Sequence, residues 1–355
     1  MRLPRELQPQ RERHDVPSGV LVTVLGAFRE RLQKMDLFTP IIGAERLHHN
    51  FLATIKPNAA GVRDVLSSWA DGFRDRDGKF VEEFQSTYNS SFLELYLFAV
   101  FKQLGLKMDF HLDAPDFVAV GHPLAIEAAI ASHAQDDVPE WEKTIKGVAD
   151  MDIETAQRQS TIRLSNALMG KSEAYLRRYA TLSHMAGRAY VVAIANYGRQ
   201  DFNLLGDVAM QHLLYDPEDK QHLLKANGAA VPIGLFNSDA YAHISAVMFS
   251  SVATFGKTRA LGKHEGEFIF RATRIRNDVE PIRILARNSE YKESLTDGLR
   301  LFTNPYAQVP LDVQRFNDPG IRRHVAEKDG RYTVTCHPDG DLCMRMVQAL
   351  LQKKD

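Results

Sequence analysis

The sequence predicts an α/β (α+β) protein with a central mixed sheet flanked by helices. Between residues 89 and 196 the pattern runs in the order helix, three strands, helix, strand. The segment YVVAIA at 190–195 is apolar on both faces, as in a strand that is covered on both sides. A length of 355 residues with 44% apolar residues is sufficient for a large core.

The N-terminal region, residues 1–85, is predicted to be helical. Apolar residues recur at near-helical spacing from Leu21 to Leu37 and again from Val62 to Phe73. Pro57 interrupts the chain between these two segments.

Residues 86–290 are predicted to form the core. A helix runs from Ser90 to Leu104, with Gly105 as its C-terminal stop. Three strands, an insertion, a long helix and two further strands follow, and their expected ranges are about 107–112, 117–120, 124–131, 133–154, 155–179, 190–195 and 244–255.

Residues 291–355 are predicted to form a turn-rich C-terminal extension. The segments NPYAQVP, NDPG and HPDGD combine proline, glycine, asparagine and aspartate, which favour turns. A short helix near Leu342–Leu351 is expected to close the chain.

Charge and cysteine content narrow the function classes. The formal net charge of −1 gives no overall attraction to nucleic acid or acidic lipid, so such binding needs a local patch. Only Cys336 and Cys343 occur, which suits a reducing compartment without structural disulfides. No apolar run approaches the roughly 20 residues that span a bilayer, and the N-terminus lacks the apolar core of a signal peptide. We therefore expect a cytoplasmic protein with no membrane partner.

Two segments come close to a phosphate-binding loop without matching it. SNALMGKS and SVATFGKT both end in Gly-Lys-Ser/Thr, but Ser165 and Ser251 stand where the first glycine belongs. The motifs GxSxG, HExxH and GxGxxG are absent, which argues against the common serine hydrolase, zinc protease and dinucleotide-binding classes.

The most informative stretch is LDAPDFVAVGHPLAIEAAIAS, residues 112–132, in which two apolar strands each carry one carboxylate. The Gly-His-Pro turn between the strands predicts that they are antiparallel neighbours, which brings Asp116 and Glu127 to one face of the sheet. Glu94 on the preceding helix becomes a third carboxylate if that helix packs on the sheet. Burying an unpaired carboxylate costs several kcal/mol, and a divalent cation offsets that cost.

Such an acidic group predicts magnesium chemistry. Mg²⁺ takes one or two protein carboxylates and keeps waters and phosphate oxygens as its other ligands, which is the arrangement that phosphodiester hydrolysis uses. The alternative is structural. A glutamate within a strand is more often the partner of an arginine, and Glu94 taken alone is more often a solvated or salt-bridged helix residue.

The order of a helix with Glu94, PDF at 115–117 and IEAA at 126–129 resembles the PD-(D/E)XK nuclease-like superfamily, which has a restriction-endonuclease-like fold. The resemblance covers about residues 89–196. It implies a nuclease that depends on Mg²⁺ (or Mn²⁺). Asp116 and Glu127 would bind the metal with the backbone carbonyl of Ala128, and Glu94 would orient the metal-bound water.

Ala129 departs from the pattern of this family, which has a lysine there to hold the attacking water and to offset charge on the phosphate. Members of the family can carry this lysine on the following helix, and Lys171 is our preferred substitute, with Gln157, Gln159 and Arg163 behind it. This helix has a basic face that suits phosphates, and a solvated position is an equally good interpretation of any single residue on it. The basic residues are Arg158, Arg163, Lys171, Arg177 and Arg178.

The sequence therefore predicts a metal-dependent nuclease that hydrolyses DNA or RNA. Its expected catalytic residues are Glu94, Asp116, Glu127 and Lys171. The alternative is a catalytically inactive nuclease-fold module that binds nucleic acid or a protein partner, which the alanine at position 129 favours. Nucleic acid is the expected partner, and the sequence is compatible with a homodimer.

Overall fold

The computed structural model describes residues 35–133, 138–142, 152–198, 205–216, 223–264, 266–276 and 281–350. The chain divides into two units, residues 1–36 and 37–355, and every element below belongs to the second. The helix predicted for Leu21–Leu37 and most of the insertion predicted near 133–154 lie outside the described residues.

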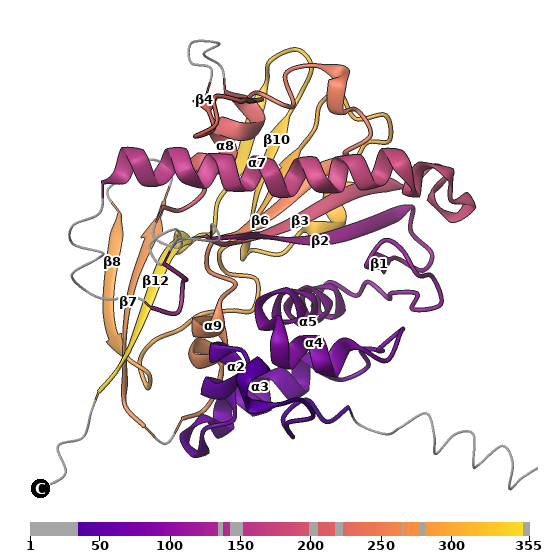
Figure 1. Cartoon of the computed structure of the whole chain (residues 1–355). Coiled ribbons are helices and arrows are strands. Elements are labelled where there is room, and N and C mark those ends of the chain that lie inside the picture. The colour runs from indigo at the N-terminus through magenta and orange to yellow at the C-terminus, as the bar shows by residue number, and fades with distance from the viewer. Residues whose placement is uncertain are drawn as a thin grey trace, which may run out of the picture. The chain divides into compact units, whose positions relative to one another are not determined.

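Within the described residues, seven strands form a mixed sheet at the centre of this unit (Figure 1). In the order in which they lie side by side, they are β1 (Phe117–Val118), β2 (Leu124–Ser132), β3 (Ala189–Tyr197), β6 (Ala246–Ser250), β9 (Leu299–Thr303), β10 (Ile321–Ala326) and β11 (Tyr332–Thr335). β2, β3 and β6 are parallel to one another, as are β9 and β10, and the other neighbours are antiparallel. The prediction of an α/β protein with a central mixed sheet is confirmed.

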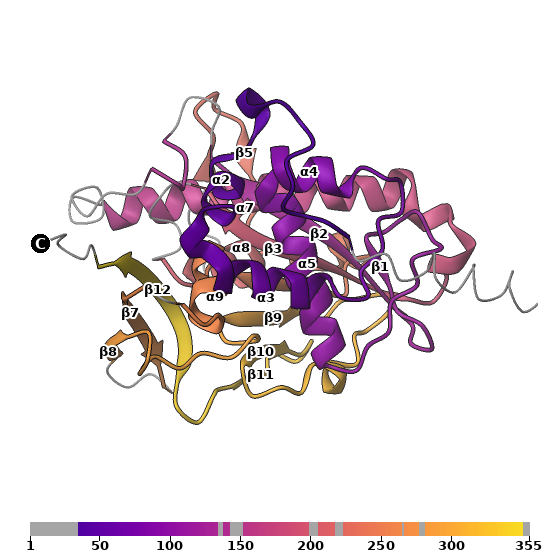
Figure 2. The ribbon, with the colours of Figure 1, turned by 90° about the horizontal axis from the view of Figure 1, so that it is seen from below.

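Helices cover both faces of this sheet. One face carries α7 (Ile153–Arg177) and α8 (Val208–Tyr215), and the other carries α2 (His49–Thr54), α3 (Ala60–Ala70), α4 (Phe80–Ser86) and α5 (Tyr88–Gln103), which are nearest the viewer in Figure 2. β3 is buried along its whole length, as YVVAIA predicts. No helix in the described parts of the chain is long and apolar enough to span a bilayer.

The remaining strands form two smaller sheets. β12 (Asp341–Ala349), β7 (Phe268–Ile275) and β8 (Ile282–Arg287) make an antiparallel sheet, and α9 (Phe255–Leu261) packs against β12 and α3. β4 (Leu223–Leu224) pairs with β5 (Ala230–Val231). Short 3₁₀ helices lie at Ala44–Arg46, Pro57–Ala59, Tyr179–Thr181, Ser183–Met185, Asp239–Tyr241 and Val313–Phe316.

The strand predicted for residues 107–112 does not form. A single bridge joins Met108 to Ala119. The Asp109 carboxylate then accepts a hydrogen bond of 2.9 Å from the backbone N–H of His111, which turns the chain. Phe110 packs against aromatic rings of α5 and of the loop after α3, so the chain leaves the sheet at this point.

The strand predicted for residues 244–255 is shorter than expected. β6 ends at Ser250, whose Oγ accepts hydrogen bonds from the backbone N–H groups of Val252 and Ala253 at 3.2 and 3.0 Å. These bonds close a turn, and the chain enters α9 at Phe255.

The helix predicted near Leu342–Leu351 is wrong, because this part of the chain is strand β12. A short apolar run fits a helix and a strand equally well by spacing alone, and here the pairing of β12 along β7 decides the conformation. β9, β10 and β11 also follow residue 291 and complete the central sheet. The division at residues 85 and 290 stays a prediction.

Candidate active site

Asp116 and Glu127 lie opposite each other at the edge of the central sheet. Phe117 pairs with Ile126 across the antiparallel strands β1 and β2, which places the preceding residue, Asp116, across from Glu127 and on the same face. The backbone N–H of Asp116 donates to Glu127 Oε2 at 3.2 Å, and the backbone N–H of Ala128 donates to Asp116 Oδ2 at 2.7 Å. The predicted pairing of the two carboxylates is therefore present.

Lys171 reaches this pair from α7. Its Nζ lies 2.7 Å from Glu127 Oε1, and the hydroxyl of Tyr179 donates to the same oxygen at 3.1 Å. Burial by itself lowers the pKa of Lys171, but the adjacent Glu127 carboxylate outweighs burial and the net pKa is raised. Glu127, only 3% exposed, is thus a buried carboxylate held by an ammonium and a hydroxyl.

Glu94 approaches from α5, on the opposite face of the sheet. Burial and then the negative charge of Asp116 raise the pKa of Glu94 to about 8. Burial and then the negative charge of Glu127 raise the pKa of Asp116 to about 6. Burial is the larger cause of both shifts, and repulsion between Glu94 and Asp116 and between Asp116 and Glu127 adds to it.

Arg76 is a second cation at the site, and the sequence did not predict it. Its Nη2 lies 3.6 Å from Asp116 Oδ1, while its Nη1 donates to the backbone carbonyls of Leu112 at 2.9 Å and Pro115 at 3.3 Å. Arg76 thereby fixes the loop that leads into Asp116. Neither Arg76 nor Tyr179 belongs to a recognisable motif, so no signal in the sequence identifies them.

Ala129, where the resemblance in sequence leads us to expect a lysine, lies beneath α7. It is on the same face of β2 as Glu127 and belongs to a buried apolar cluster with Leu164 and Leu168 of α7. A lysine here would force an ammonium into that cluster or displace the helix. The small side chain instead lets α7 lie close to β2, and Lys171 on that helix reaches Glu127.

Two of the basic residues predicted on α7 point in different directions. Arg163 precedes Lys171 by eight residues, which at 3.6 residues per turn is about 80° around the helix, and so it lies toward the same side. Arg158 is displaced by about 140° from Lys171 and donates to the backbone carbonyl of Leu224 at 3.2 Å. Arg163 therefore lies nearer than Arg158 to the side of α7 that carries Lys171, although about 12 Å from it along the helix axis.

The last two basic residues of this set lie at the end of α7. Arg177 is exposed and pairs with Glu173 one turn earlier at 2.6 Å. The guanidinium of Arg178 lies 5.9 Å from the ring centre of Tyr179, the residue whose hydroxyl holds Glu127. Arg178 thus contacts a residue that binds Glu127, whereas Arg177 pairs with a residue of its own helix.

Whether this site can bind a divalent metal depends on how many of its side chains can act as ligands. The described residues contain no group of three or more His, Cys, Asp or Glu side chains arranged to hold a metal ion. Mg²⁺ needs only one or two carboxylates from a protein, and Asp116 and Glu127 offer two side by side. Burial and then neighbouring negative charge raise the pKa values of Asp116 and Glu94, and a divalent cation would favour the ionised form of both. The residues present therefore fit a site with two carboxylate ligands.

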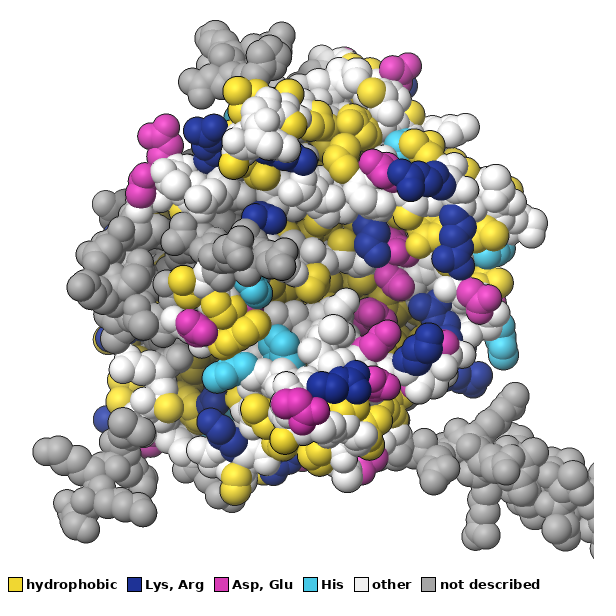
Figure 3. All heavy atoms as spheres, viewed as in Figure 1, with side chains coloured by type: hydrophobic (Ala, Val, Ile, Leu, Met, Phe, Trp, Pro, Cys, Tyr) yellow, Lys and Arg dark blue, Asp and Glu magenta, His cyan; other side chains and the backbone are white. Residues whose placement is uncertain are grey.

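The site is open to solvent at one side. Asp116 and Lys171 have 24% and 30% of their side-chain surface exposed. Figure 3 shows a hollow between α7 and the helices α4 and α5, in which Lys, Arg, Asp and Glu side chains gather. A substrate can thus approach the acidic pair from this hollow.

Comparisons with models of protein families, with curated proteins and with solved structures found no match. The function of the protein is therefore inferred from its own residues. The arrangement of Glu94, Asp116, Glu127 and Lys171 is the main source for that inference.

Proposed function

We propose that this protein is a metal-dependent nuclease with a restriction-endonuclease-like core of the PD-(D/E)XK type, and that it hydrolyses phosphodiester bonds of DNA or RNA. The contact of 2.7 Å between Lys171 and Glu127 is the observation that carries the proposal. It supplies, from α7, the cation that is missing at Ala129. The register that sets Asp116 beside Glu127 supports the same reading.

Asp116 and Glu127, with the backbone carbonyl of Ala128, would hold Mg²⁺ or Mn²⁺. When bound, such an ion polarises the phosphoryl group and lowers the pKa of a bound water. Glu94 lies close enough to Asp116 to feel its charge, and its carboxyl group, ionised once a metal offsets the local negative charge, would accept a hydrogen bond from the attacking water and orient it.

Lys171 offsets the negative charge that develops on the phosphate oxygens during hydrolysis. Its hydrogen bond to Glu127 fixes the ammonium before substrate arrives, so little reorganisation is needed at the moment of reaction. Tyr179 and Arg76 hold the two carboxylates from outside and thereby position them.

The test is cleavage of plasmid DNA, single-stranded DNA and RNA with Mg²⁺ or Mn²⁺. Asp116→Asn should abolish cleavage, because the substitution removes a metal-binding charge while keeping the shape of the side chain. The matched control is Asp113→Asn, an exposed aspartate in the preceding loop, which should cleave like the wild type. Equal thermal unfolding midpoints of the two variants would show that the fold is retained.

The contrary result is a protein that cuts no nucleic acid with any metal and binds no metal by calorimetry. That result would favour an inactive module that binds nucleic acid or a protein partner. The hydrogen bonds that already occupy the oxygens of Asp116 and Glu127 support this second candidate.

A further inference from the structure

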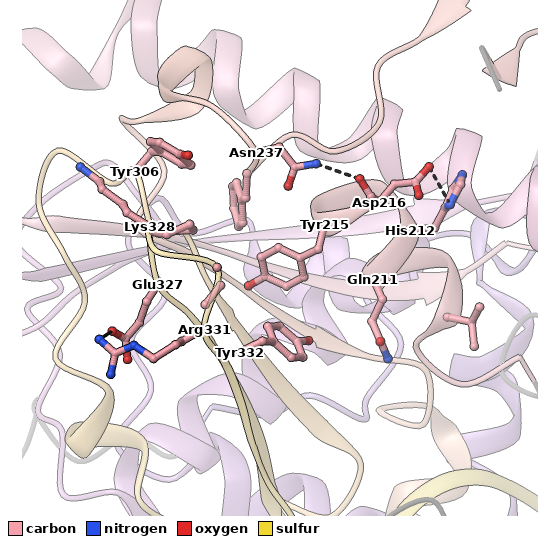
Figure 4. Close-up of a pocket in the computed structure, with 15 residues that line it drawn as sticks. Gln211, His212, Tyr215, Asp216, Asn237, Tyr306, Glu327, Lys328, Arg331 and Tyr332 are labelled. Carbon is pink, nitrogen blue, oxygen red and sulfur yellow. Dashed lines mark hydrogen bonds and ion pairs between the residues drawn. The ribbon is translucent and has the colours of Figure 1, made fainter. Parts of the chain in front are cut away.

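A pocket of about 680 Å³ lies between α8 and the β10–β11 hairpin (Figure 4). Its volume is within the range that small ligands occupy in proteins. β11 is five strands away from β2 in the central sheet, or about 24 Å at the usual spacing of about 4.8 Å between strands. The pocket is therefore separate from the candidate active site.

Two tyrosine rings form the fixed wall of this pocket. The hydroxyl of Tyr215 donates to the backbone carbonyl of Thr303 at 2.5 Å, and the hydroxyl of Tyr332 hydrogen-bonds His324 Nδ1 at 2.6 Å. Because both hydroxyls are satisfied by the sheet behind them, the rings are held in place and present aromatic surface to the pocket. The rings stand at 76° to each other with their centroids 5.5 Å apart, so a flat aromatic ligand that stacks on one of them meets the other at its edge.

Two side-chain amides stand at the rim. Asn237 Nδ2 donates to the backbone carbonyl of Asp216 at 2.8 Å, which orients the amide, while Asn237 Oδ1 accepts no hydrogen bond from a described residue. The Gln211 amide likewise makes no side-chain hydrogen bond within the described parts of the chain. Each amide offers donors and an acceptor side by side, as the edge of a nucleobase does.

One cation at the pocket lacks a carboxylate partner among the described residues. Lys328 Nζ lies 5.5 Å from the ring centre of Tyr306, whereas the neighbouring Arg331 is neutralised by Glu327 at 2.5 Å. Figure 4 shows Lys328 and Tyr306 together on one side of the pocket, with Arg331 and Glu327 pointing toward each other. The pocket therefore offers one unmatched positive charge beside its aromatic wall.

We propose that this pocket binds one nucleotide unit. The base stacks on the half-exposed ring of Tyr332 with Tyr215 at its edge, its polar edge meets the amides of Gln211 and Asn237, and a phosphate is held by Lys328. A free nucleotide and an unstacked nucleotide of a nucleic-acid strand share this chemistry. The proposal does not depend on nuclease activity.

The test is calorimetry with AMP, GMP, CMP and UMP and with the corresponding nucleosides, in the presence of a chelator so that no metal bridges phosphate to the acidic pair. We expect at least one nucleotide to bind. Tyr332→Ala should weaken its binding by about 5- to 150-fold, the loss that follows removal of one base-stacking ring. Lys328→Ala should weaken nucleotides and leave nucleosides unchanged.

Controls separate binding from folding. Tyr332 is 45% exposed, so its truncation should leave the unfolding midpoint near that of wild type, and Tyr332→Phe, which keeps the ring, should bind nearly as well as wild type. Tyr306→Ala, which removes the ring beside Lys328 and so its support at the phosphate position, is a second variant if Tyr332→Ala unfolds. Lys56→Ala, an exposed lysine on the N-terminal helices, should not change binding.

Oligonucleotides distinguish the two sources of the ligand. A strand that binds no more tightly than its mononucleotide identifies a free nucleotide, and a strand that binds more tightly identifies an unstacked nucleotide. The proposal is overturned if no nucleotide binds, or if affinity is the same in Tyr332→Ala, Tyr306→Ala and wild type. Binding measured under chelation is independent of cleavage, so failure here and failure of the nuclease proposal are distinct results.

Discussion

Buried charged side chains are paired differently at the candidate active site and in a second group of residues. We call the second group the core ion cluster; its residues are Lys257, Arg274, Glu293, Asp297 and Arg345. Lys257 and Arg345 both contact Glu293, and Arg274 binds Asp297 through both Nη atoms, at 2.7 and 3.2 Å. The side chains of Lys257 and Glu293 have no exposed surface at all. Every charge in this cluster therefore has a partner of opposite sign.

At the candidate active site Glu127 contacts Lys171 and Asp116 contacts Arg76, whereas Glu94 makes no ion pair with a described residue. The pKa values of Glu94 and Asp116 are raised there. In the core ion cluster the pKa of Asp297 is lowered, because Arg274 outweighs the effect of burial. Asp297, which Arg274 binds directly, thus shifts in the opposite direction from Glu94, which no described cation contacts. We infer that loss of one partner from the core ion cluster destabilises the fold, whereas the acidic pair beside Glu94, which is open to solvent, is available to a cationic ligand.

Removal of Glu293 should have the largest effect, and it tests the core half of this comparison. Glu293→Ala leaves the ammonium of Lys257 and the guanidinium of Arg345 buried without their carboxylate. Breaking a buried ion pair costs about 3–5 kcal/mol, so the free energy of unfolding should fall by about that amount in urea denaturation. The exposed Glu82→Ala is the control and should change stability little. If Glu293→Ala loses no more free energy of unfolding than Glu82→Ala, the core ion pairs do not stabilise the fold.

Truncation of Lys171 tests the candidate active site. If Lys171 supplies the cation missing at position 129, Lys171→Ala should lower the rate of cleavage by about 10²–10³-fold, since a preorganised electrostatic group is worth that much. Lys171→Arg should keep part of the activity, because it keeps the charge with a different shape. Rates are measured with saturating Mg²⁺, and Lys56→Ala serves as the control. A change below about tenfold, on the scale of such groups, would remove Lys171 from catalysis.

The contributions of Glu94 and Asp297 to stability should change with pH in opposite directions. The pKa of Glu94 is about 8 in the folded protein against an ordinary 4.5, so its contribution to stability is complete below about pH 4.5 and is lost as pH rises through 8. The pKa of Asp297 is lowered, so its contribution is present above its ordinary 3.8 and is lost as pH falls through the folded value.

Glu94→Gln should therefore flatten the fall of stability between pH 5 and 8 in chelated protein, where the charge of Glu94 is not offset by a metal. Denaturation across this pH range provides the measurement, and Glu82→Gln is the control. If the free energy of unfolding of the wild type rises with pH over this range, and Glu94→Gln shows the same curve, the charge of Glu94 does not destabilise the folded protein.

The parts of the fold that the sequence predicts are those set by local patterns. Gly105, with φ 72°, ends α5 as expected, and Gly121, with φ 74°, makes the turn that sets Asp116 beside Glu127. The apolar run of β3 is likewise local. A glycine at a fixed position and a short hairpin need no knowledge of the rest of the chain.

Partners that lie far apart in the chain account for what the sequence does not predict. Ala246 pairs with Thr303, and β12 pairs with β7 some seventy residues earlier, so neither pairing follows from periodicity. Arg76 in a loop and Tyr179 in the 3₁₀ helix after α7 also reach the acidic pair from distant parts of the chain, so no local pattern predicts them. Lys171 is different, because the resemblance implies a cation near position 129 and thereby predicts a lysine on the following helix.

The smallest expected effect concerns the basic face of α7, where the structure separates two residues that the sequence places together. Arg163 lies toward Lys171, and Arg158 is turned away and bonded to a backbone carbonyl. Arg163→Ala should weaken nucleic-acid binding several-fold and lower the slope of log affinity against log salt by about 0.9, the value for one lost phosphate contact with duplex DNA. Arg158→Ala should leave both quantities unchanged. Salt titrations of binding to catalytically silent Asp116→Asn measure this, and equal slopes for the two variants would mean that α7 does not face the phosphates as proposed.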